Sequence, residues 1–201
     1  MKQLLRLTRI VDRVNAGIGE AMSWTLLIVV LLSTGNAIVR KVFSAGSNAA
    51  LEMQLYLFAA IFLLNGGNTL LRNEHIRIDV LSARLSARGR LWIDVFGILF
   101  FLLPAASMTA WMALPVLART FRGNEASSSV GGLLLWPAWA LIVVGFGLLI
   151  LQALAELIKR IAQLRGYEVD PPPGAPPGPL QDPAQMIEQE RLAMKSAGGD
   201  K

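Results

Sequence analysis

Four long apolar runs dominate this sequence of 201 residues. They cover about residues 21–39, 53–71, 91–117 and 133–156, and polar segments separate them. An α-helix needs about 20 apolar residues to cross the ~30 Å hydrocarbon core of a bilayer. Inside the bilayer the backbone must satisfy its own hydrogen bonds, so runs of this kind fold as helices. The sequence therefore predicts an all-α membrane protein with four transmembrane helices.

The composition agrees with this fold class and excludes several functions. Only 16% of the residues are charged, against about 25% in soluble domains. The absence of cysteine excludes disulfides, thiolate catalysis and Fe–S clusters. The net charge of +5 reflects basic residues beside membrane spans. We therefore predict membrane lipids, and no nucleic acid, around this chain.

Two amphipathic segments accompany the spans. Residues 1–19 are predicted to form an amphipathic interfacial helix that lies in the membrane surface or leads into the first span. Its apolar positions recur at three- and four-residue steps: Leu4, Leu7, Val11, Val14 and Ile18. A second, mid-chain surface helix is predicted at about residues 78–89, with Ile78, Leu81 and Leu85 at similar steps.

The spans carry features that favour contact with protein. Asn65, Gly66, Gly67 and Asn68 interrupt the second span, and Gly145 lies in the fourth. Small residues let helices approach closely, and amide side chains can bond across the contact. In the third span, Pro104 is expected to kink the helix, and Pro115 is a position at which it can end.

The last segment, residues 166–201, has a different chemistry. Seven of its residues between 171 and 183 are proline, a composition typical of an extended, unpacked chain. The predicted organisation is therefore the N-terminal helix at 1–19, a four-span membrane domain at 20–165, and a disordered tail at 166–201.

The distribution of lysine and arginine predicts the orientation. Twelve lie beside one set of span ends and four beside the other. The larger set comprises Lys2, Arg6, Arg9, Arg13, Arg72, Arg77, Arg84, Arg88, Arg90, Lys159, Arg160 and Arg165, and the smaller set Arg40, Lys41, Arg119 and Arg122. Cytoplasmic segments collect such residues. Both termini are therefore predicted to be cytoplasmic.

The charged segment around His75 does not fit a metal or haem site. A haem between helices usually needs two axial imidazoles in spans, and His75 is the lone histidine. Arg72 and Arg77 would repel a cation held by Glu74 and Asp79. A network of ion pairs and hydrogen bonds at the membrane surface is the better interpretation, so no metal, catalytic or substrate-binding residue and no cofactor is predicted.

The carboxylates nearest the bilayer, Glu52 and Asp94, lie near span ends, and no span has a charge near its centre. Buried charges at mid-bilayer usually mark ion or substrate paths. Transporters that carry their own site often show internal repeats, and none is evident here. These observations favour a structural or partner-contact role and argue against a self-contained ion-coupled pump.

Three local patterns together resemble the small membrane subunit of tripartite ATP-independent periplasmic (TRAP) transporters. They are Glu52 at the start of the second span, the segment Arg72-x-x-His75-Ile76-Arg77-Ile78-Asp79-Val80, and Trp136-Pro137 at the entry to a Gly- and Leu-rich span with Gln152. In the second pattern Ile78 replaces the family's usual valine. The resemblance covers about residues 15–165 and leaves out the proline-rich tail.

The resemblance implies an accessory scaffold subunit, and no enzyme, in the bacterial inner membrane. It implies two protein partners, a large TRAP membrane subunit and a periplasmic substrate-binding protein. The large subunit would import an organic acid, often a carboxylate, by sodium symport, and would itself hold sodium and substrate. Assembly residues are expected among the patterns above: Glu52, Asn65, Asn68, Arg72, His75, Arg77, Asp79, Trp136 and Gly145.

Two other readings remain open from the sequence. A stand-alone four-span enzyme of the glutathione-transferase type would use the arginine-rich face to bind an anionic cofactor. A solitary sensor or adaptor would recruit a partner through the proline-rich tail. The first predicts thiol-conjugation activity from the isolated chain, and the second predicts loss of function when residues 168–201 are deleted.

Overall fold

The computed structural model describes residues 2–43, 48–72, 87–129 and 132–167. The helices are α1 (Lys2–Phe43), α2 (Asn48–Leu71), α4 (Ala87–Gly97), the π-helical turn η1 (Ile98–Leu102), α5 (Leu103–Gly123) and α6 (Trp136–Leu164). Four helical stretches are long and apolar enough to cross a bilayer, with α4, η1 and α5 together forming one of them. The predicted all-α membrane fold with four transmembrane helices is confirmed. Most of the predicted surface helix at 78–89, and nearly all of the tail, lie outside the described residues.

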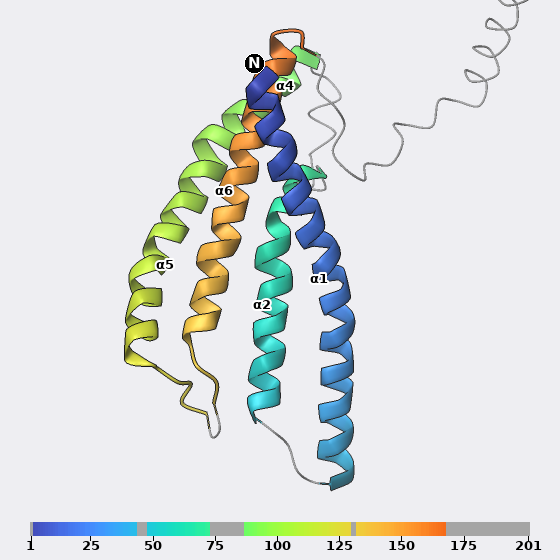
Figure 1. The fold of residues 1–201 in the computed structure, drawn as a ribbon, viewed down its shortest axis with the longest axis vertical. Helices are drawn as coiled ribbons and strands as arrows, with labels where there is room; N and C mark the ends of the chain where they lie inside the picture. Colours follow the sequence, from blue (N-terminus) through green and yellow to red (C-terminus); the bar gives the residue numbers. More distant parts are fainter. Residues whose placement is uncertain (1, 44–47, 73–86, 130–131, 168–201) are drawn as a thin grey trace, which may run out of the picture. The chain divides into compact units, whose positions relative to one another are not determined.

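Helix α6 is the centre of the helical packing. It contacts α1, α2, α4, η1 and α5, whereas α5 packs on α6 and its preceding turn η1 (Figure 1). A small apolar core forms where Ala153 of α6 meets Leu70 of α2 and Ile98 of η1. Any polar side chain on the inner faces of α6 is therefore placed against several other helices at once.

Helix α1 runs without interruption from Lys2 to Phe43. The segment predicted as an interfacial helix therefore leads directly into the first span. Apart from Gly19, the residues that its first half buries are polar, namely Thr8, Asp12 and Asn15, while Leu7 and Val14 are exposed. In a bilayer, apolar side chains can face lipid at no cost, so polar side chains gain most by packing inward.

The third span contains a π turn immediately before Pro104. The backbone N–H of Leu103 donates to the carbonyl of Ile98, five residues earlier, and Pro104 lies in the first turn of α5. Proline lacks an N–H and crowds the preceding turn, and a wider turn accommodates this. The helix then passes through Pro115 and ends at Gly123, capped by Asn124 in the left-handed conformation (φ 46°). Pro115 therefore does not end the span, which extends beyond residue 117.

Candidate functional site

Five buried polar side chains link α1 to α6. Asp12 and Asn15 lie one turn apart on α1, and Gln152, Glu156 and Lys159 follow at four- and three-residue steps on α6. Residues at these steps share one face of a helix, so the two sets meet across the contact. Each of the five is at most 7% exposed. We refer to these five residues as the polar cluster.

The ammonium group of Lys159 is the centre of the polar cluster. Its Nζ donates to Asp12 Oδ1 at 2.7 Å and to Glu156 Oε1 at 2.6 Å. Gln152 Nε2 donates to the same Asp12 oxygen at 2.9 Å, and Asn15 Nδ2 donates to Gln152 Oε1 at 2.9 Å. Each charge thus has a partner of opposite sign, which a buried charge requires. This series of hydrogen bonds, from Asn15 through Gln152 and Asp12 to Lys159, fixes the register of α1 against α6.

A neighbouring arginine extends this network to α4. Arg160 Nε lies 3.4 Å from Asp94 Oδ2, and one of its terminal nitrogens, Nη2, lies 3.6 Å from Glu156 Oε2. Asp94 belongs to α4, so charged groups from three helices meet at the end of the domain where α1 begins and α6 ends (Figure 1). These ion pairs link the helices to one another and so help to hold them in place.

Helices α1 and α2 interlock through two glycine–asparagine contacts. A Cβ atom added to Gly67 of α2 would collide with the amide of Asn15, and one added to Gly19 of α1 would collide with the amide of Asn68. Each asparagine thus lies over the glycine of the opposite helix. Small residues that allow such close approach are typical of helix contacts in membranes. Asn15 therefore links α1 to two helices: it packs on Gly67 of α2 and donates a hydrogen bond to Gln152 of α6.

Helices α2 and α6 approach closely at Gly145. A Cβ atom there would lie 2.8 Å from both the Cβ and the carbonyl oxygen of Leu63. Two of the clashing atoms belong to the main chain of Leu63, which cannot relieve the clash by a change of rotamer as a side chain can. Gly145 is therefore needed for the observed spacing of α2 and α6.

At the opposite end of the helices, Glu52 of α2 holds the segment that joins α5 to α6. Its carboxylate accepts from Ser127 Oγ at 2.5 Å and from the backbone N–H of Leu133 at 2.6 Å. Tyr56, one turn later, donates its hydroxyl to the carbonyl of Leu134 at 3.0 Å. Hydrogen bonds to a charged acceptor are the stronger kind. The start of α2 therefore anchors this segment.

Replacing Glu52 with alanine should loosen the segment while leaving the helices folded, because both of these hydrogen bonds would be lost. Amide hydrogen exchange at Leu133 should become faster. The matched control is Glu125→Ala in the same segment. Among the described residues, the Glu125 side chain forms an ion pair only with the exposed Arg119, a contact of little energetic value. Unchanged exchange at Leu133 in the Glu52 variant would contradict the anchoring role.

The residues predicted from sequence as assembly residues fall in several places. Gly145, Glu52 and Asn68 make the contacts within the chain described above, and Trp136 packs edge-on against Phe121 at 5.5 Å. Arg72 is exposed and donates from Nε to Asn68 Oδ1 at 3.3 Å. His75, Arg77 and Asp79 lie outside the described residues. A role of these side chains in assembly stays a prediction.

Sequence reasoning did not identify the polar cluster. It counted Lys159 among the basic residues beside the span ends, and it gave no role to Asp12, Asn15 or Glu156. A signal was present, since Thr8, Asp12, Asn15 and Gly19 recur at the same steps as the apolar stripe of α1. Among the described residues, no three acidic or histidine side chains gather as ligands for a metal ion.

The comparisons with known proteins point to one family. Residues 28–163, about two thirds of the chain, match the family model for "Tripartite ATP-independent periplasmic transporters, DctQ component". The α6 side of the polar cluster lies within the matched range, and the α1 side precedes it. No curated protein and no solved structure matches the chain.

Proposed function

The chain belongs to the DctQ-component family of tripartite ATP-independent periplasmic transporters, and we propose that it is a fixed scaffold beside the large membrane subunit. It is thus a small transporter component, with four helices able to span the bacterial inner membrane. Its family is one of transporter components rather than enzymes.

The proposal assigns the transport chemistry to the partners. A periplasmic binding protein captures an organic acid, a carboxylate, and delivers it to the large subunit. The large subunit binds sodium and substrate and moves the substrate inward. This chain packs beside it, with both termini in the cytoplasm, and holds its scaffold in the bilayer.

The observation that carries the proposal is the internal pairing of the polar cluster. Intramembrane charges on a substrate path face the route that the solute takes. Here Lys159 is held between Asp12 and Glu156, which belong to α1 and α6 of the same chain. The charges thus join helices to one another, as a rigid support requires.

Co-expression with the large subunit of the same transporter tests the proposal. The two chains should purify together from detergent, and the large subunit should be recovered in lower yield without this chain. An Asp12→Asn/Lys159→Met variant, which weakens the tie between α1 and α6, should lower the yield of complex. The complex that does form should keep the wild-type KM for substrate and for sodium. An altered KM at unchanged yield would contradict a scaffold role.

A further inference from the structure

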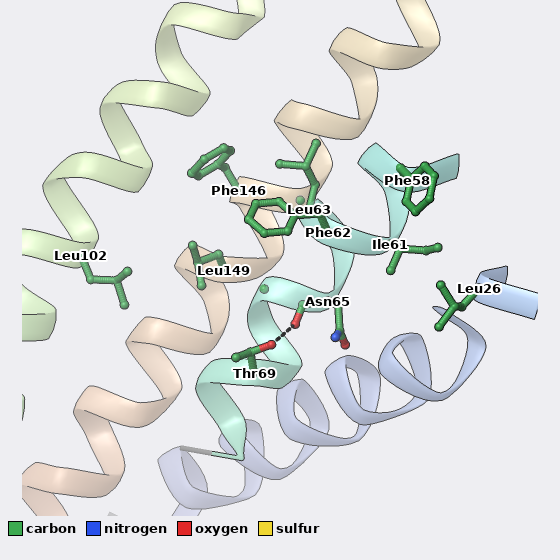
Figure 2. Close-up of a pocket in the computed structure, with 12 residues that line it drawn as sticks. Leu26, Phe58, Ile61, Phe62, Leu63, Asn65, Thr69, Leu102, Phe146 and Leu149 are labelled. Atoms are coloured by element: carbon green, nitrogen blue, oxygen red, sulfur yellow. Dashed lines mark hydrogen bonds between the residues drawn. The ribbon is translucent and has the colours of Figure 1, made fainter. Parts of the chain in front are cut away.

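A groove of about 540 Å³ runs along one side of α2. Figure 2 shows Phe58, Phe62 and Asn65 of α2 along it, with Leu26 of α1 on one side and Leu102 of η1 on the other. Its lining is apolar except for Asn65 and Thr69. Helix α6 also lines the groove, so residues of all four spans meet there.

Asn65 places an amide with one unpaired polar atom beside this groove, within the hydrocarbon. The residue lies roughly 8 Å from the midpoint of α2 along the helix axis, inside the ~15 Å half-thickness of the core. One polar atom of its amide, Oδ1, accepts from Asn68 Nδ2 at 3.0 Å. The other, Nδ2, has no hydrogen-bond partner among the described residues. Turning the amide over, so that Oδ1 and Nδ2 change places, would still leave one of the two atoms unpaired.

An amide atom without a hydrogen bond in hydrocarbon favours a protein occupant over a lipid chain. Acyl chains offer neither donors nor acceptors, whereas a second helix can supply a polar side chain. Thr69, one turn after Asn65, donates to the backbone carbonyl of Asn65 at 3.1 Å (Figure 2). Its hydroxyl oxygen can still accept a hydrogen bond from a partner.

Gly66 leaves the groove open to close approach. A Cβ atom there would meet nothing within 4 Å, in contrast to the next residue, Gly67, which is needed against α1. Phe62, one turn before Gly66, is 82% exposed and can pack against an incoming helix. The groove thus offers an aromatic contact, an amide and a glycine within about one turn of α2.

We propose that this groove seats one transmembrane helix of the large subunit, which packs on Gly66 and hydrogen-bonds to Asn65. The inference rests on the proposed function and adds the docking surface to it. The partner helix presents a small or apolar residue to Gly66 and a polar side chain to Asn65. The helices of this chain keep their mutual contacts in the complex.

The test uses Gly66→Leu in the chain co-expressed with the large subunit. Because a Cβ atom at Gly66 meets nothing within 4 Å, leucine should extend into the open groove. The variant should therefore fold normally and co-purify at least about tenfold less large subunit. The matched control is Gly35→Leu on α1, where a Cβ also meets nothing within 4 Å. It should co-purify wild-type amounts. Normal recovery with Gly66→Leu would overturn the docking surface and leave the scaffold role standing, whereas failure of the wild-type pair to co-purify would remove both.

A photo-reactive phenylalanine analogue at Phe62 gives an independent measurement in the intact complex. The control position is Trp24, which is 68% exposed and lies roughly 160° around α1 from Leu26. Phe62 should form an adduct with the large subunit in higher yield than Trp24. Adducts from Phe62 with phospholipid alone, or a stronger subunit adduct from Trp24, would overturn the proposal.

Discussion

Replacing Lys159 with methionine is expected to destabilise the folded chain by about 3–5 kcal/mol. The substitution removes the ammonium that bonds both Asp12 and Glu156, whose side chains are each only 6% exposed. Glu156 still has Arg160 nearby at 3.6 Å, so Asp12 is the carboxylate left buried without an opposite charge. The apparent melting temperature of the chain purified in detergent should fall by roughly 10 °C.

Two further variants separate this effect from a general loss of charge. Lys41→Met changes an exposed lysine in the last turn of α1 and should leave the melting temperature nearly unchanged. Adding Asp12→Asn to Lys159→Met should recover part of the loss, because asparagine is neutral and keeps an oxygen for Gln152. If Lys159→Met has the melting temperature of the wild type, the ammonium group of Lys159 is not what compensates the buried negative charge of Asp12.

Replacing Gly145 with alanine should cost about 1–3 kcal/mol, the range for forcing an extra methyl group into a packed contact. The added Cβ would lie 2.8 Å from the carbonyl oxygen of Leu63, so α2 and α6 would have to move apart. The polar cluster and the core around Ala153 lie on the same helix, so the separation would disturb both. Thermal unfolding in detergent measures the cost.

The same helix supplies the control for this prediction. A Cβ atom at Gly147, two residues later, meets nothing within 4 Å. Alanine there should be neutral or slightly stabilising, because alanine has a higher helix propensity than glycine. Equal stability of the two alanine variants would show that the approach of α2 to α6 does not depend on Gly145.

The glycine and asparagine residues of the second span were recognised from the sequence as features of a protein-facing surface, but the sequence could not say which helix each of them contacts. The structure divides them by partner: Gly67 and Asn68 contact α1, whereas Gly66 and Asn65 border the open groove. Adjacent residues point about 100° apart on a helix, so this division depends on where α1 lies.

The amphipathic pattern of the first 19 residues shows the same limit. The apolar stripe predicted a helix, and the structure has one, but the pattern could not say which face packs against protein. In water the apolar face would turn inward. In a bilayer the exposed Leu7 and Val14 can face lipid while Asp12 and Asn15 pair with α6.

The sequence by itself determined that the chain is helical and crosses a membrane four times, because bilayer thickness sets the length of each apolar run. It also carried the family patterns around Glu52 and Trp136. Only the tertiary structure decided which polar groups meet. Asp12 and Lys159 are 147 residues apart in sequence, and their pairing follows from how α1 crosses α6, which no local pattern encodes.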